Sequence, residues 1–171
     1  MNIYDHFKQQ AQYNLWADKL LLEHVALLSD EQYLADKGLF FNSVHGTLNH
    51  LVLGSSAWYS RLVGDVFEFS GLDQELYTNR QCLAEELVLC GQRWVCFIDA
   101  ISVEKFNTPI TYQTSKGQTI CLPAGQLLAH VFNHATHHRG QVSVAFSAEG
   151  EPVPKMDLIY YLLEEGGLLI E

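Results

Sequence analysis

The sequence is poor in positive charge and lacks a long apolar run. Among its 171 residues, 10 are Lys or Arg and 20 are Asp or Glu, and the formal net charge is −10. No cluster of Lys or Arg interrupts this excess of negative charge, so neither nucleic acid nor an anionic membrane surface is expected as a partner. No basic leader and no stretch of about 18 consecutive apolar residues occurs, which predicts a cytoplasmic protein without a membrane span.

Cysteines are also few. The four of them, Cys82, Cys90, Cys96 and Cys121, show no C-x-x-C or C-x-H spacing. That pattern indicates neither a zinc knuckle nor a thioredoxin-like motif. In a cytosolic chain, such residues are usually small buried side chains rather than reactive thiols. The predicted site therefore contains no cysteine.

Proline is scarce as well, and all four prolines (Pro109, Pro123, Pro152 and Pro154) fall outside the segments with helical periodicity. Because proline breaks helix interiors, the long segments remain free to be helices. In these segments, apolar residues recur at intervals of three and four residues. The predicted helices span about residues 4–28, 43–64, 79–101, 123–149 and 157–165, with a short turn near 29–35. Pro123 is expected only in the first helical turn, where proline is tolerated, and Gly64 and Gly150 are the expected helix stops.

The remaining segments differ in composition. Residues 107–123 place β-branched and aromatic residues around a Ser115-Lys116-Gly117 turn, which predicts a two-stranded hairpin, whereas residues 65–78 are predicted to be a loop. Four long helices, one hairpin and one loop favour an all-α, up-down four-helix bundle with the hairpin between the third and fourth long helices. Residues 1–171 are expected to form a single domain, since no repeat or linker interrupts them.

The stretch "FNHATHHRGQ" (132–141) concentrates three of the eight histidines. Each helical residue advances by about 100°, so position around the helix separates them. The apolar side of this helix is defined by Leu127, Val131, Val142 and Ala145. His134 and His138 lie within that side, whereas His130 and His137 lie on its flank. The inward pair is either two hydrogen-bonded core histidines or two ligands of one cation.

A third ligand would have to come from another helix, and His6, His24, His45 and His50 are the choices. His6 and His24 lie about 27 Å apart along one helix, so both cannot reach one site. His50 is surrounded on its helix by the small residues Gly46, Thr47, Gly54 and Ala57, and His45 has no such clearing. The hypothesis is therefore a metal site built from His50, His134 and His138.

Three motifs carry a family resemblance: "YNLWADKLLL", "SVHGTLNHLVLGSSAWYSRL" and "LLAHVFNHATHHRGQVSVAF". With the order of elements, they make the chain resemble the DinB-like (YfiT-like) superfamily of metal-binding four-helix bundles. The resemblance implies a divalent metal held by one histidine of the second long helix and two of the fourth, here His50, His134 and His138. It also implies a homodimer. Characterised relatives in this superfamily include thiol S-transferases and a thiol-dependent isomerase. The family name implies no DNA chemistry.

Three histidines with an open fourth position are typical of catalytic zinc. The leading functional hypothesis is a metal-dependent transferase that activates a low-molecular-weight thiol, such as bacillithiol, mycothiol or glutathione, towards a small-molecule electrophile. One alternative is a metal-dependent hydrolase, although no H-E-x-x-H motif supplies a base. Another is a non-catalytic protein that binds metal or a small ligand. Zinc is the expected metal, and nickel is credible.

Several polar and aromatic residues are expected near the metal ligands. Gln141, His130 and His137 are candidates to orient a ligand or to border the pocket. Arg139, at about 140° from His134 around the helix, is expected to form an ion pair or a packing contact instead. Asn49, Tyr13 and Trp16 are further candidates for the pocket border, although ordinary packing is the favoured alternative for them.

Overall fold

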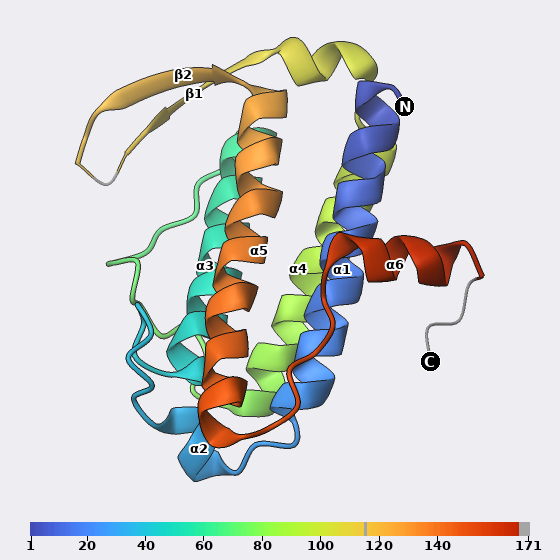
Figure 1. Ribbon diagram of the computed structural model, residues 1–171. Coiled ribbons are helices and arrows are strands. Elements are labelled where there is room, and N and C mark those ends of the chain that lie inside the picture. The colour runs from blue at the N-terminus through green and yellow to red at the C-terminus, as the bar shows by residue number, and fades with distance from the viewer. Residues whose placement is uncertain (115, 168–171) are drawn as a thin grey trace.

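Four long helices lie side by side, with a hairpin at one end of the bundle and a short helix packed across one side (Figure 1). The computed structural model describes residues 1–114 and 116–167. In chain order the elements are α1 (Ile3–Val25), α2 (Asp30–Leu34), α3 (Val44–Val63), α4 (Arg80–Ala100), the 3₁₀ helix η1 (Val103–Asn107), β1 (Pro109–Gln113), β2 (Thr119–Pro123), α5 (Ala124–Glu149) and α6 (Leu158–Glu165). The predicted four-helix bundle is confirmed.

The helix ends follow local capping chemistry. The Ser43 side chain accepts a hydrogen bond from a backbone N–H in the first turn of α3, and Asn79 does the same for α4. Gly64 and Gly150 end α3 and α5 with φ values of 77° and 72°, a left-handed conformation that favours glycine. Both predicted stops are thus confirmed, because side-chain caps and C-terminal glycines can be identified from sequence.

Two predicted boundaries were wrong by a few residues. The first helix ends at Val25 rather than Leu28, because the chain tightens into bonds from Leu27 N–H to the His24 carbonyl and from Leu28 N–H to the Val25 carbonyl. Leu28 is nevertheless buried, which explains why its apolar spacing looked helical. Pro123 ends β2 and caps α5 instead of lying in its first turn. The 3₁₀ helix η1 was not predicted.

The predicted hairpin is confirmed. Strands β1 and β2 pair antiparallel, with Tyr112 opposite Ile120, and they extend away from the N-terminal end of α5 (Figure 1). Gly117 in the turn has a φ of 74°. Ser115 of the predicted turn lies outside the described residues, as do residues 168–171 of the predicted 1–171 domain.

The order of helix directions departs from a strict up-down bundle. Helices α3 and α4 run in the same direction, and residues 65–78 return along the bundle between them (Figure 1). A hydrogen bond of 2.9 Å from Trp94 on α4 to Ser55 on α3 joins this parallel pair. The predicted up-down alternation of helix directions was wrong at this step. An extended loop of this length reaches up to about 45 Å, whereas α3 is only about 30 Å long, so the loop can run back along α3 and let α4 start at the same end.

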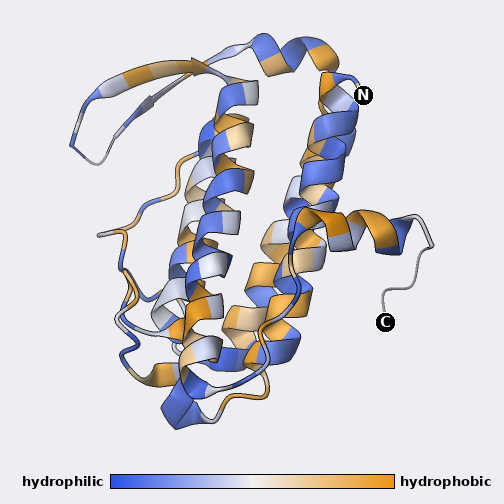
Figure 2. Cartoon of the chain, viewed as in Figure 1, coloured by the Kyte–Doolittle hydropathy of each residue, from blue (hydrophilic) through white to orange (hydrophobic). Residues whose placement is uncertain are grey.

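The core fills the space between the four long helices. Its largest cluster, near the α2 end, includes Leu21, Leu48, Leu83, Leu87, Val142 and Phe146. A second cluster at the hairpin end is mostly aromatic and includes Phe7, Trp94, Phe106 and Phe132. Orange and blue segments alternate along the long helices, as expected of amphipathic helices (Figure 2). In the described part of the chain, no helix combines the length and apolar character that crossing a membrane requires.

Candidate metal centre

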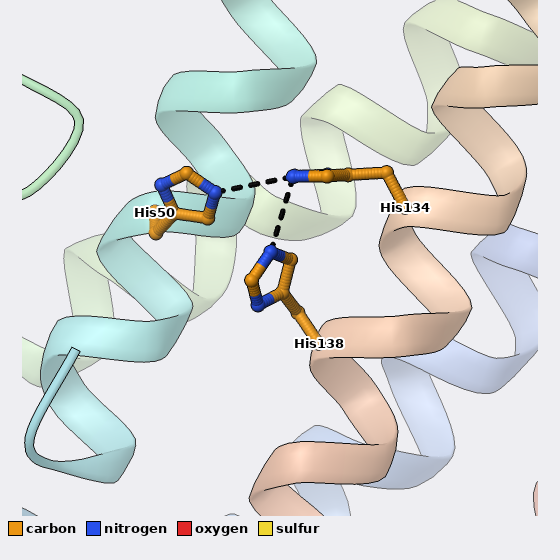
Figure 3. Close-up of side chains that lie close together, drawn as sticks. All are labelled: His50, His134 and His138. Carbon is orange, nitrogen blue, oxygen red and sulfur yellow. Dashed lines mark hydrogen bonds between the residues drawn. The ribbon is translucent and has the colours of Figure 1, made fainter. Parts of the chain in front are cut away.

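Three histidine side chains converge between α3 and α5 (Figure 3). The Nε2 atom of His134 lies 3.2 Å from Nε2 of His50 and 3.1 Å from Nε2 of His138. One nitrogen of each ring lies within 4.8 Å of one nitrogen of each other ring, so this cluster could hold a metal ion. Helix α5 supplies two rings from successive turns because their spacing of four residues places them on one face.

The outer nitrogens of two rings are held by hydrogen bonds. His50 Nδ1 lies 2.8 Å from the Leu72 carbonyl oxygen, which can only accept, so Nδ1 carries the proton and donates. His138 Nδ1 lies 2.8 Å from Gln141 Oε1 and donates in the same way. In a neutral imidazole the other nitrogen then carries a lone pair. Both Nε2 atoms therefore point a lone pair at the centre of the cluster.

These contacts leave the cluster with more acceptors than donors. His134 Nε2 has at most one proton when neutral, and it can be given to only one of its two neighbours. At least one inward lone pair then lacks a donor within the triad. A divalent cation would satisfy all three nitrogens together, and three imidazoles are a donor set that zinc, nickel, copper and iron accept.

The electrostatics of the site favour neutral rings. Burial, reinforced by the neighbouring histidines, lowers the pKa of His134 to about 3. Burial also lowers the pKa of His138 to about 4, against the opposing effect of its hydrogen bond to Gln141. The pKa of His50 is lowered by burial as well. The neutral form of all three imidazoles, which is the form that binds metal, is thus favoured at neutral pH.

Packing fixes the ring positions. Phe41 stacks on His50 with ring centroids 3.9 Å apart and an interplanar angle of 18°. A Cβ atom at Gly54 would lie 3.2 Å from His134 Cε1, so the absence of a side chain there leaves room for that ring. The small residues of α3 therefore do provide clearance, but not beside His50 as predicted. Gly54 accommodates His134, and Gly46 accommodates the backbone of Phe41.

His130 and His137 lie beside the triad without joining it. The His137 ring is exposed, and its Nε2 lies 3.1 Å from Gln141 Nε2. His130 packs edge-on against Trp58 at 4.8 Å between centroids, and burial together with Arg61 lowers its pKa. Gln141 thus links His137 to the triad, while His130 borders the neighbouring cavity.

Arg139 has the structural role that its helical position predicted. It is almost fully buried and forms an ion pair with Asp18 at 2.9 Å, and its guanidinium also donates to the Asn14 side-chain oxygen at 2.7 Å. These contacts join α5 to α1. The predicted ion pair is confirmed.

Three predicted border residues lie elsewhere. Asn49 binds the backbone of Leu76 and Tyr77, so it fastens the 65–78 loop. Tyr13 and Trp16 pack against Tyr161 of α6 on another side of the bundle. The favoured alternative, ordinary packing, is thus confirmed for Tyr13 and Trp16, and none of the three residues lines the cavity beside the triad.

The histidines that were set aside also have other partners. His45 is buried and lies 2.9 Å from the Tyr33 hydroxyl and 3.0 Å from Glu75. His24 Nδ1 lies 3.0 Å from the Leu20 carbonyl oxygen. None of these rings, nor that of His6, is part of the cluster that could hold a metal.

A cavity of about 490 Å³ opens beside the triad. Its walls come from α3, α5, the 65–78 loop, the segment before α3 and β1, and they include Phe41, Trp58, Phe69 and Tyr112. Among the described residues that line it, none is an aspartate or a glutamate. A cavity with several aromatic walls thus adjoins the three histidines, as is common for small-molecule sites.

The Leu72 carbonyl and the Phe41 ring are site components that the sequence did not reveal. Leu72 contributes a backbone atom from an irregular loop, where no side-chain pattern marks it. Phe41 precedes α3 in a segment whose Asn42 has a φ of 66°. The Phe40-Phe41 pair before a helix cap was a weak signal, since aromatic residues in such segments are usually packing residues.

Comparison with known proteins identifies the family. The family model described as "DinB family" matches residues 3–166. Protein DinB of Bacillus subtilis (strain 168) is 25% identical over 157 residues, which cover 88% of this chain and 90% of that protein.

Two solved structures have a similar fold. YfiT from Bacillus subtilis, described as a probable metal-dependent hydrolase with an unusual four-helix bundle topology, superposes with a TM-score of 0.68 at 12% identity, over 86% of this chain and 90% of its own. A DinB-like protein from Bacillus cereus ATCC 10987 superposes with a TM-score of 0.62 at 19% identity, over 88% of this chain and 95% of its own. The family match over nearly the whole length, together with this fold, shows that the chain belongs to the DinB family.

Proposed function

We propose that this protein is a metal-dependent transferase that joins a low-molecular-weight thiol to a small electrophile. The observation that carries the proposal is the position of three neutral imidazoles in the wall of a cavity whose described lining residues include no carboxylate. A divalent ion held by His50, His134 and His138 would supply the positive charge that lowers the pKa of a coordinating thiol. Activation of a thiol in this way needs no carboxylate base.

The chain's own residues would prepare the site in three ways. The Leu72 carbonyl and Gln141 keep the Nδ1 protons of His50 and His138 in place, so that Nε2 faces the centre. Phe41 shields the His50 ring from water by stacking on it. The apolar walls of the cavity exclude water from the reacting groups, which strengthens electrostatic effects there.

The proposed reaction is a substitution. The thiol sulfur uses an electron pair to bond to a carbon of the electrophile, and the bond from that carbon to the leaving group breaks, so that the leaving group keeps the pair. The thiol proton passes to His137 at the edge of the cavity or to solvent. His137 is suited to this transfer because it is exposed and has access to water.

The test uses zinc-loaded protein with glutathione, bacillithiol or mycothiol and a panel of haloaromatic and halomethyl electrophiles. Thioether product, measured by mass spectrometry, should form faster than in a protein-free control, and chelator or His138→Ala should abolish the difference. His24→Ala is the matched control, because His24 lies outside the cluster and should leave the rate unchanged. A zinc-loaded protein that conjugates none of these thiols would contradict the proposal.

A second candidate is metal-assisted hydrolysis. The solved YfiT structure, with a similar fold, is described as a probable metal-dependent hydrolase. Hydrolysis requires a general base beside the attacking water. His130 or His137 would have to be that base, since the described residues that line the cavity include no carboxylate. Turnover of activated esters or amides without any thiol would favour this candidate. Metal-dependent stabilisation without either activity would favour a binding role.

A further inference from the structure

Arg61 places a cationic side chain in the wall of the cavity beside the triad. Among the described residues that line it, Arg61 is the only lysine or arginine, and it adjoins no carboxylate there. The chain as a whole has twice as many acidic as basic residues. A lone arginine in a small-molecule cavity of an acidic protein therefore needs a partner or a structural reason.

Aromatic stacking holds the Arg61 guanidinium in place. Its Cζ atom lies over the Trp58 ring at 4.5 Å and over the Tyr112 ring at 5.1 Å. The two rings are inclined at 75° to each other, so the guanidinium can lie flat on at most one of them. These cation–π contacts engage its charge and do not pair its N–H groups with an oxygen acceptor. Within the described residues, Arg61 forms no ion pair or side-chain hydrogen bond, in contrast to Arg80, Arg93 and Arg139.

Burial increases the energetic importance of the positive charge on Arg61. Arg61 is half-buried, and burial lowers its pKa from the ordinary value. A desolvated cation with unused donors gains more from an anion than a fully hydrated one does. A guanidinium held by cation–π contacts, with no acidic partner among the described residues, has the properties of an anion-binding group.

Arg61 and the triad lie at two ends of the same cavity. Trp58, over which the guanidinium lies, follows His50 by about two turns of α3, or roughly 12 Å along its axis. His130 lies between them, with ring centroids 4.8 Å from Trp58 and 5.4 Å from His134. A ligand that spans the cavity would thus have one end at the histidines and the other at Arg61.

We propose that Arg61 binds the carboxylate of a ligand whose other end reaches the three histidines. The inference rests on the proposed function only in placing a thiol at the histidine end. It narrows the substrate class to extended molecules with a terminal carboxylate, because a planar guanidinium pairs with a carboxylate through two parallel hydrogen bonds. The aromatic and aliphatic walls between the ends suit an apolar linker.

The first test measures binding of octanoate and of its neutral isostere octanamide to chelator-treated protein by calorimetry. Removing the metal excludes it as the anion's partner, so the result does not depend on thiol chemistry. Octanoate should bind about tenfold to a hundredfold tighter than octanamide. Arg61→Gln should bring the two affinities together, and Arg61→Lys should keep part of the preference.

Arg93→Gln is the matched control, because the Arg93 guanidinium is paired with Glu86 at 2.6 Å and does not line this cavity. It should keep the full preference for octanoate. A purely structural role of Arg61 would weaken both probes alike and leave their ratio unchanged. An unchanged ratio in Arg61→Gln, equal affinities in the unmodified protein, or no binding of either probe would overturn the proposal.

The second test compares ω-mercaptoalkanoates of graded length with their amides on zinc-loaded protein. The preference for the carboxylate should peak at one length and disappear in Arg61→Gln. A preference seen with octanoate but with no mercaptoalkanoate would assign the carboxylate to the electrophile instead of the thiol. Failure of thiol conjugation with an intact octanoate preference would leave the Arg61 site standing while contradicting the transferase.

Discussion

Two polar clusters on neighbouring faces of α5 differ in how completely their groups are paired. Arg139 and Asp18 are buried, and with Asn14 and Thr136 they form a closed set of hydrogen bonds of 2.7 to 3.0 Å. The adjacent residue, His138, belongs to a triad whose inward nitrogens have more lone pairs than protons. The first cluster is complete within the chain, whereas the second could hold a cation from outside.

Burial alone therefore does not mark a functional group. Arg139 is more deeply buried than any of the three histidines, yet its contacts either join α1 to α5 or lie within α5. The triad is less buried and borders a cavity. Incomplete pairing next to open space distinguishes the candidate site from the structural network.

Removing one charge of the Arg139–Asp18 pair should have the greatest effect on stability. Arg139→Met leaves the Asp18 carboxylate buried without its cation, and should lower the free energy of unfolding by about 3–5 kcal/mol. Urea unfolding of chelator-treated protein measures it. The double variant Asp18→Leu with Arg139→Met removes both charges and should recover much of the loss. A loss below about 1 kcal/mol in the single variant would mean that the pair is unimportant for stability.

An intermediate effect is expected where the triad is supported by a hydrogen bond. Gln141→Leu removes the acceptor of the His138 Nδ1 proton and should weaken zinc binding about tenfold to a hundredfold. Competition with a chromogenic chelator measures the dissociation constant. Gln141→Glu keeps the acceptor and should bind at least as tightly as the unmodified protein. Asn133→Ala, an exposed change on the same helix, is the control, and equal affinities in all four proteins would contradict this role.

The smallest expected effect tests ring packing. Gly54→Ala places a Cβ atom 3.2 Å from His134 Cε1, so the ring must move by a few tenths of an ångström. Zinc affinity should fall by a few fold, or about 1 kcal/mol. Gly140→Ala is the matched control on α5, because a Cβ atom there meets nothing within 4 Å. It should slightly raise stability through helix propensity and leave zinc binding unchanged. Tighter zinc binding in Gly54→Ala would contradict the packing argument.

Much of the bundle could be predicted because its helices carry local signals. Ser43, Gly64 and Gly150 mark helix ends through chemistry that involves only neighbouring residues. The direction of α4 could not be predicted, because residues 65–78 are long enough either to retrace α3 or to cross to a helix of opposite direction. Helix α6 lies over Tyr13 and Trp16 for reasons of tertiary packing that no local pattern encodes.

The candidate site could be predicted only as far as helical periodicity reaches. The spacing of His134 and His138 places both rings on one face, and the structure brings His50 to them from α3. The Leu72 carbonyl, the Phe41 ring and the partner of Arg139 come from other elements, whose approach depends on the assembled fold. Sequence spacing identified the inward-facing side chains but not the groups that hold them in place.

We infer that the triad binds one metal ion through all three histidines. Untagged protein, purified without a nickel column, and the variants His50→Ala, His134→Ala and His138→Ala would be analysed for metal content by mass spectrometry, with His24→Ala as control. We expect a stoichiometric divalent metal, most simply zinc, in the unmodified protein and in His24→Ala, and almost none in the three triad variants. Full metal retention in any triad variant, or no metal uptake by the unmodified protein from added zinc, would contradict the claim.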